Sequence, residues 1–395
     1  MILLNRNNNA AILLAGICSL VVGVGVARFV FTSLLPPMLE DFLSISFAGI
    51  LASVNYMGYL SGAIFSIFIK DIYSKVKYFR FGLFLCIFTS LLLGVSEHPL
   101  IWLIARLVAG FGAAMALVVG SAIVMSKLTG INKTKAMGVH FSGLGFSILI
   151  TDLIVRWVFN QGENWQVAWL VLSVFGTVIA LYSGFILSFD KQAHQEVTKH
   201  KFDKSLFSPF IIILILAYFA EGVGMVVQAT FLPDIVNSLP GLSGYGSLTW
   251  LVVGIAGIPS CIIWMQLANR HGSVNIIMIA MLLQVIGVLI PTLTTNIYWN
   301  VFSGILYGGT FVGLVALFMN YGGQLAGKNP VLIMGAMTSA YGIGQIIAPL
   351  YCVALIDKFH NYDMALVITA IIVFSGVLIL AYAKANLTVG NSQVR

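Results

Sequence analysis

Long apolar runs separated by short polar segments dominate this chain. A membrane-spanning helix needs about 20 mainly apolar residues, and the runs reach or approach that length. Gly and Pro recur inside them, which membrane helices tolerate better than soluble ones. The pattern predicts twelve transmembrane helices, at 10–34, 46–69, 79–96, 99–126, 134–158, 165–188, 207–232, 246–268, 273–293, 297–323, 330–356 and 362–384.

One polar segment is longer than the others, and it divides the predicted spans into six plus six. We therefore expect an N-terminal six-helix bundle at 1–188, a cytoplasmic linker loop at 189–206, and a C-terminal six-helix bundle at 207–395. The first apolar run continues to about Leu35 without an obvious small-residue cleavage site. It is interpreted as a first transmembrane helix and not as a signal peptide.

Composition agrees with an integral membrane protein. Of the 395 residues, 59% are hydrophobic and 8% are charged, whereas soluble domains carry about 25% charged residues. If both termini are cytoplasmic, sixteen of the 20 Lys and Arg residues lie on the inner side and only Lys358 lies outside. The positive-inside rule then explains the net charge of +7. We expect a monomeric, multi-pass protein of a bacterial inner membrane, with no nucleic-acid partner.

Five ionisable side chains fall inside the predicted spans: Arg28, Arg106, Asp152, Arg156 and Glu221. A charge near the bilayer centre costs about 2.5–3.5 kcal/mol on insertion scales. Such residues usually face a cavity, a partner or a solute path. Their presence favours a protein that moves something across the membrane.

The two halves of the chain resemble each other at an offset of about 197 residues. The segment 137–145 in span five aligns with 334–342 in span eleven, and Leu35-Pro36 aligns with Leu232-Pro233. Two matches at one offset, in equivalent spans, indicate an internal duplication.

Several motifs resemble the major facilitator superfamily. The run 106–114, an Arg followed by a Gly-rich face, resembles its fourth-helix motif, and 267–272 resembles its inter-helix motif. The resemblance implies an all-α membrane fold of two pseudo-symmetric six-helix bundles that alternate around a central site. It also implies that spans 1, 4, 7 and 10 line the cavity.

The resemblance narrows to the YbfB/YjiJ-like branch and covers essentially the whole chain. Glu221 departs from that branch, where an apolar residue is expected. Span five also lacks the Pro that follows its Gly motif in drug–proton antiporters. The segments that carry the resemblance are 27–36, 229–233, 254–261, 308–311 and 340–345.

Helix geometry places Arg28 and Arg106 at similar depth in the outer half of the membrane, at about 1.5 Å per residue. The planar fork of an arginine suits a carboxylate, so both are candidates for binding an anionic solute. Arg106 has an alternative role, capping carbonyl groups or pairing with Asp152. Asp152 and Arg156 are four residues apart and can pair on one helix face.

Glu221 lies near the middle of span seven, where a carboxyl group can bind and release a proton. Glu221, His140 and Asp152 are therefore the candidates for proton coupling, with static hydrogen bonding or ion pairing as the alternative. Further candidates for the solute-binding wall are Thr32, Asn55, Tyr59, Gln228, Trp250, Tyr307, Asn320, Tyr341 and Gln345.

The sequence thus predicts a proton-coupled secondary transporter of a small organic anion, with export favoured over uptake. A multidrug–proton antiporter is the alternative within the class. A channel, a non-transporting receptor or a membrane-embedded enzyme is the alternative outside it. The sequence shows no catalytic constellation, nucleotide fingerprint or metal-ligand spacing, so we expect no enzyme, cofactor or metal. The expected partners are the solute, protons and the lipid bilayer.

Overall fold

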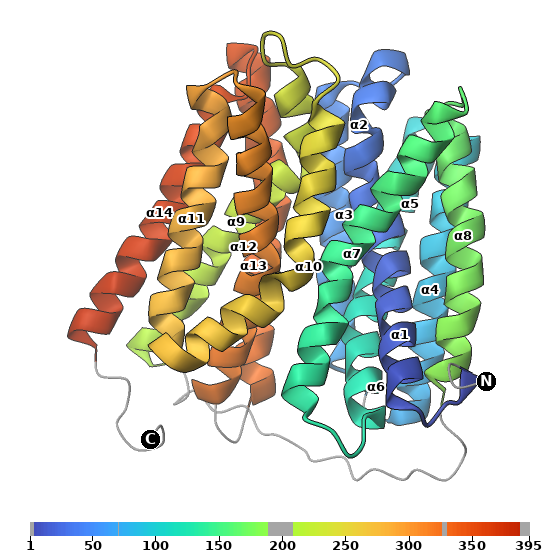
Figure 1. Cartoon of the computed structure of the whole chain (residues 1–395), viewed down its shortest axis with the longest axis vertical. Coiled ribbons are helices and arrows are strands. Elements are labelled where there is room, and N and C mark those ends of the chain that lie inside the picture. The colour runs from blue at the N-terminus through green and yellow to red at the C-terminus, as the bar shows by residue number, and fades with distance from the viewer. Residues whose placement is uncertain (1–3, 70, 189–207, 326–329, 388–395) are drawn as a thin grey trace.

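The structure is a computed structural model that describes residues 4–69, 71–188, 208–325 and 330–387. Helices are the only regular secondary structure in those ranges. Twelve of the helical stretches are long and apolar enough to span a membrane (Figure 1). The linker predicted at 189–206 lies outside the described residues.

The first six spans form one bundle and the last six form another (Figure 1). Spans one and four each contain a π-helical segment between two α-helices. The elements of the first bundle are α1 (Asn9–Leu20), η2 (Val21–Phe29), α2 (Val30–Asp41), α3 (Ile45–Ser66), α4 (Ile72–Val95), α5 (Pro99–Ala114), η3 (Met115–Val119), α6 (Gly120–Lys127), α7 (Lys133–Asn160) and α8 (Trp165–Ile186). Those of the second are α9 (Pro209–Asn237), α10 (Gly246–His271), α11 (Ser273–Leu293), α12 (Ile297–Leu325), α13 (Pro330–Phe359) and α14 (Asp363–Asn386).

Polar residues between the spans begin many of these helices. A side-chain oxygen at the N-cap accepts a hydrogen bond from an otherwise unpaired backbone N–H of the first turn. The capping side chains of this kind belong to Asn8, Ser44, Asp71, Asn132, Asn164 and Ser208.

Three helices extend five or more residues beyond their predicted ends. Asp71 caps α4 by accepting a hydrogen bond of 2.8 Å from the Ser74 backbone N–H, so the third span begins at Ile72 and not at 79. Spans one and seven continue past Pro36 and Pro233, which lie inside α2 and α9. The prediction placed both prolines after the helices, but a membrane helix can accommodate proline when neighbouring groups satisfy the freed carbonyls.

The bundles contact each other through α2 with α9, α3 with α13, and α7 with α10. Thr32 donates a hydrogen bond to the Ala229 carbonyl, which is 197 positions further along the chain. Repeat-equivalent positions therefore meet between the bundles. Helix α1 begins and α14 ends at the same end of the molecule (Figure 1), which we call the terminal face.

Candidate functional site

Arg28 is buried where η2 ends, with 7% of its surface exposed. Its guanidinium carbon lies over the rings of Tyr59 and Tyr56 on α3, 4.6 and 4.8 Å from their centroids. Nε and Nη2 have no hydrogen-bond partner among the described residues. Burying a charge without a partner is costly, so Arg28 has unused capacity to bind an anion.

The π-helical segment η2 sets the position of Arg28. The Val30 backbone N–H donates to the Gly25 carbonyl, five residues earlier. Single π segments inside α-helices are frequent at functional sites. The second π segment, η3, packs against η2, and a Cβ atom on Gly23 would lie 2.4 Å from the Ala116 Cβ. The absence of a side chain at Gly23 therefore permits the contact between η2 and η3.

Arg106 supports the backbone beside Arg28. Its Nη1 donates a hydrogen bond of 3.1 Å to the Ala27 carbonyl, and its guanidinium carbon lies 4.4 Å from the Phe31 ring centroid. Of the two alternatives predicted for Arg106, the structure shows the hydrogen bond to a carbonyl group. Arg106 does not pair with Asp152, because the Asp152 carboxylate is bonded to other partners.

Aromatic side chains of the second bundle approach the same region. Phe29, next to Arg28 in the chain, makes edge contacts with Trp250 and Phe311 at centroid distances of 6.0 and 6.1 Å. Tyr307 stacks on Phe311 at 5.0 Å. Trp250 is fully buried, and its indole Nε1 has no hydrogen-bond partner in the described part of the chain. Aromatic walls from both bundles therefore meet beside Arg28.

Glu221 is fully buried in α9, and neither carboxyl oxygen has a hydrogen-bond partner within 3.5 Å among the described residues. The side-chain amide of Gln284 on α11 lies beside the carboxyl group and can donate a long hydrogen bond to it. Tyr218, one turn before Glu221, stacks on Tyr341 with ring centroids 4.5 Å apart. An ionised carboxylate without donors is expensive to bury, so this group is suited to carrying a proton.

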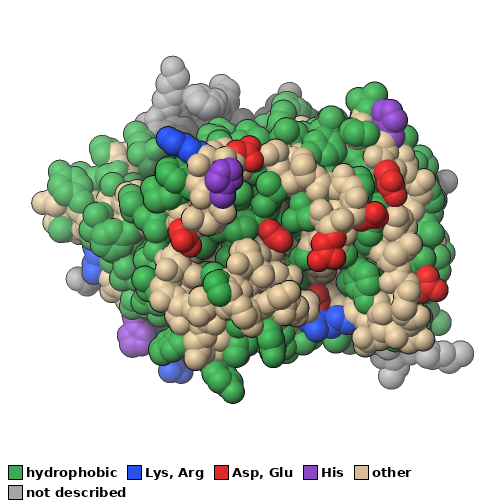
Figure 2. All heavy atoms as spheres, turned by 90° about the horizontal axis from the view of Figure 1, so that it is seen from above, with side chains coloured by type: hydrophobic (Ala, Val, Ile, Leu, Met, Phe, Trp, Pro, Cys, Tyr) green, Lys and Arg blue, Asp and Glu red, His purple; other side chains and the backbone are tan. Residues whose placement is uncertain are grey.

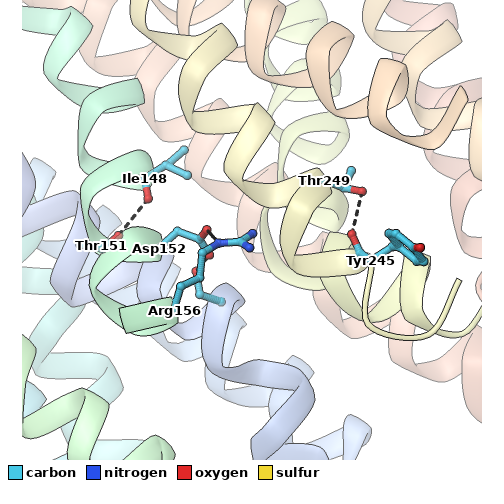
Figure 3. Close-up of polar contacts among 7 residues, drawn as sticks. Ile148, Thr151, Asp152, Arg156, Tyr245 and Thr249 are labelled. Carbon is cyan, nitrogen blue, oxygen red and sulfur yellow. Dashed lines mark hydrogen bonds and ion pairs between the residues drawn. The ribbon is translucent and has the colours of Figure 1, made fainter. Parts of the chain in front are cut away.

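Asp152 and Arg156 form the ion pair that their spacing predicts. Arg156 Nε lies 2.7 Å from Asp152 Oδ2, and the guanidinium extends from α7 toward α10 (Figure 3). The other oxygen of Asp152 accepts a hydrogen bond of 3.0 Å from Ser33 on α2. These contacts join α7 to span one, and both oxygens of Asp152 are occupied.

His140 lies inside the first bundle. It is fully buried, and its Nε2 shares a hydrogen bond of 2.8 Å with the Ser121 hydroxyl. A Cβ atom on Gly16 would lie 2.6 Å from His140 Nδ1, so the ring packs directly against α1. The described contacts of His140 are with its own bundle.

Several polar residues predicted for the binding wall instead form contacts within one bundle. Asn55 donates to the Arg106 carbonyl, where α3 crosses α5, at 2.9 Å. Gln228 contacts the Gly287 carbonyl and Ser303 at 3.4 and 3.3 Å. Their amide N–H groups are therefore used between helices of one bundle, whereas Gln228 Oε1 has no hydrogen-bond partner among the described residues. Among the remaining candidates, Thr32 and Trp250 contact the opposite bundle and Tyr59 covers Arg28, whereas Tyr307, Tyr341 and Gln345 contact α9 of their own bundle.

The interface is closed away from the terminal face and hollowed near it. Ser53 donates to the Ile346 carbonyl at 2.9 Å, and Ser46 contacts both oxygens of Asp357 at 3.0 Å. A cavity of about 530 Å³ lies between the terminal ends of α7 and α10. Asn320, predicted for the binding wall, lies in this cavity with Lys135, Gln266 and Asn269.

The face opposite the termini is acidic. Figure 2 shows Asp and Glu side chains distributed across it. The acidic residues exposed at the helix ends on this face are Glu40, Asp41, Glu97, Glu163, Asp357 and Asp363. In the described part of the chain, no group of three His, Cys, Asp or Glu side chains could hold a metal ion.

Two important residues were not identified from the sequence. Tyr56 covers Arg28 together with Tyr59, and Gln284 lies beside Glu221. Tyr56 lies one turn before Tyr59, and residues three apart share a helix face. This spacing was a weak signal that Tyr56 lies beside Tyr59. Gln284 is uncharged and lies on a different helix from Glu221, so neither its chemistry nor its position in the sequence indicated a contact.

Twelve spans in two six-helix bundles, with charged side chains buried inside them, are the architecture of a major facilitator transporter. The crystal structure of a point mutant of the nucleoside transporter NupG has the same fold, with a TM-score of 0.72 and 12% identity over 94% of this chain and 99% of that one. The family model described as "Uncharacterised MFS-type transporter YbfB" matches residues 20–381, so the chain belongs to this family. The MFS-type transporter YtbD of Bacillus subtilis is 20% identical over 269 residues, which cover 68% of this chain and 67% of YtbD.

Proposed function

We propose that this protein is a proton-coupled secondary transporter of a small organic anion of the carboxylate type. The observation that carries the proposal is Arg28, a buried guanidinium with two unpartnered nitrogens beside the interface of the bundles. An arginine is always charged and binds carboxylates in a two-donor geometry. An anion that enters from solution supplies the partner that the protein does not.

Glu221 is the proton carrier in this proposal. Its support is the burial of both carboxyl oxygens, neither of which has a hydrogen-bond partner within 3.5 Å among the described residues. Asp152 is removed from the proton-coupling set, because its oxygens are bonded to Arg156 and Ser33. His140 is given a structural role in this proposal, because its Nε2 is bonded to Ser121 and its ring packs against α1, although Nδ1 has no partner among the described residues.

The terminal face is cytoplasmic in this proposal, in a bacterial cytoplasmic membrane. Two observations support it: Lys and Arg gather in the segments on that side, and carboxylates are exposed on the opposite face (Figure 2). The cavity between the terminal ends of α7 and α10 then lies at the cytoplasmic side of the interface. A cavity on that side suits the loading of an exported solute, and export is the direction we propose.

Flux in proteoliposomes tests the proposal. Polar carboxylates are added under an imposed pH gradient, in both orientations of the gradient, with protein-free liposomes measuring the leak. Wild-type protein is expected to accumulate at least one carboxylate against its gradient. Arg28→Gln removes the anion partner and is expected to abolish flux and exchange.

Glu221→Gln separates coupling from binding. The amide keeps the size of the side chain but carries no exchangeable acid proton. Proton-driven accumulation is expected to disappear, while exchange of labelled for unlabelled solute continues. Normal accumulation by this variant would refute the proton role, and normal flux by Arg28→Gln would refute the anion site.

A further inference from the structure

The groups around Arg28 indicate which anion fits. We infer that the site binds a flat aromatic monocarboxylate, whose carboxylate is shared between the Arg28 guanidinium and the indole N–H of Trp250. The two donors come from opposite bundles, so one anion would join them. The inference rests on the proposed function, because it names the solute class of the same site.

The unpartnered nitrogens of Arg28 are the right pair for a carboxylate. Nε and Nη2 form the side-on edge of the guanidinium, which offers two parallel N–H groups. Neither has a partner among the described residues. The indole Nε1 of Trp250 is a third buried donor without a partner. Arg28 and Trp250 lie around the same ring, at 5.6 Å and 6.0 Å from the Phe29 centroid.

The walls of the site favour an aromatic ligand. Tyr56 and Tyr59 turn their ring faces toward the guanidinium from the first bundle. Trp250 and Phe311 contact Phe29 from the second. A ring attached to the bound carboxylate would meet these side chains in face or edge geometry, and each such contact adds a factor of about two to ten in affinity.

The remaining charges favour a single negative charge on the ligand. Arg106 donates through Nη1 to the Ala27 carbonyl and lies against the Phe31 ring, and of its buried nitrogens only Nε lacks a partner in the described part of the chain. Arg156 is paired with Asp152. A dicarboxylate would therefore find no second intramembrane guanidinium that is free of bonds to the protein, and burying its other charge would be costly.

Calorimetric binding to the purified full chain tests the inference with three matched probes. Benzoate carries a flat ring and a carboxylate, cyclohexanecarboxylate carries the same charge on a saturated ring, and benzyl alcohol carries the flat ring without the charge. Benzoate is expected to bind about tenfold tighter than cyclohexanecarboxylate, and benzyl alcohol is expected not to bind measurably.

Trp250→Phe tests the indole donor, because it keeps an aromatic ring and removes the N–H. Loss of a hydrogen bond to a charged group predicts an affinity for benzoate about tenfold weaker. The matched control is Trp169→Phe, which removes another buried indole N–H without a partner, in α8. This control is expected to leave the affinity unchanged.

Each outcome identifies which statement is wrong. Equal binding of benzoate and cyclohexanecarboxylate would overturn the aromatic class while leaving the proposed function intact. Equal affinities of the Trp250→Phe and Trp169→Phe variants would overturn the indole donor. Failure of every carboxylate to bind or be transported would count against the proposed function itself. If Trp250→Phe does not fold, Tyr59→Leu replaces it, with the preference for benzoate expected to shrink toward equality.

Discussion

Buried polar side chains divide into two kinds in this protein. Asp152 has partners on both oxygens, and its contacts stay within the first bundle. Arg28 and Glu221 have buried, ionisable polar atoms without partners among the described residues. An ionisable group left unpaired in a low-dielectric interior reduces stability, so its retention is consistent with a partner that comes and goes. The proposed function therefore gives the solute to Arg28, the proton to Glu221 and a structural role to Asp152.

Replacing Asp152 with Asn tests that distinction. Asn keeps the shape and can still accept from Ser33, but it removes the charge that pairs with Arg156. We expect unfolding to become easier by about 1–3 kcal/mol, the usual cost of disrupting a charged hydrogen bond, with proton-driven flux retained. Thermal unfolding and the flux assay measure the two effects, and Ser33→Ala is the milder control. Loss of proton coupling at unchanged stability would return Asp152 to the proton path.

At the scale of helices, close contact between the bundles depends on glycine. A Cβ atom on Gly145 of α7 would lie 2.3 Å from the backbone of Gly257 and Ile258 on α10. Small residues allow helices in membranes to approach in this way. Because the neighbour is backbone, the helices themselves would have to separate to make room for a side chain.

Gly145→Ala is therefore expected to push α7 and α10 apart. Overpacking typically costs about 1–3 kcal/mol, and transport should slow because this contact joins the moving bundles. Gly138→Ala on the same helix is the matched control, since its Cβ would meet the Ile262 side chain at an ordinary 3.5 Å. Thermal unfolding and flux rates compare the two. Equal behaviour of the variants would mean that the Gly145 contact does not limit either property.

The sequence predicted which segments are helices better than where they end or how they bend. Apolar length alone located all twelve spans. The sequence pattern did not predict the π segments η2 and η3, which pack against each other through Gly23 and Ala116, residues far apart in the chain. The extension of α2 past Pro36 was missed because the proline was interpreted as a helix end.

At the scale of the whole molecule, the internal repeat was the strongest long-range signal in the sequence. Its offset of about 197 reappears as the contact of Thr32 with Ala229. The site itself was only partly predictable. The charges of Arg28 and Glu221 were conspicuous in apolar runs, but the tyrosines around Arg28 and the amide beside Glu221 are brought there by other helices. Contacts of that kind depend on bundle packing, which periodicity does not encode.

Alternating access requires the closed side of the interface to open during transport. Ser46 on α3 and Asp357 on α13 are 3.0 Å apart at the closed side and belong to different bundles. Replacing both with Cys and joining them with a short bifunctional thiol reagent should hold the side opposite the terminal face closed. We expect flux to stop after cross-linking and to recover when a reducible linker is cleaved.

The controls for this cross-link are the two single-cysteine variants treated with the same reagent. The native cysteines are free; Cys86, Cys261 and Cys352 are buried and Cys18 is partly buried. The single variants therefore report any effect of the reagent on native thiols, and they are expected to retain flux. Benzoate binding should survive in the locked protein if the cavity near the terminal face leads to Arg28. Undiminished flux through the fully cross-linked protein would show that transport does not require α3 and α13 to separate. That result would refute the rocking motion of the two bundles.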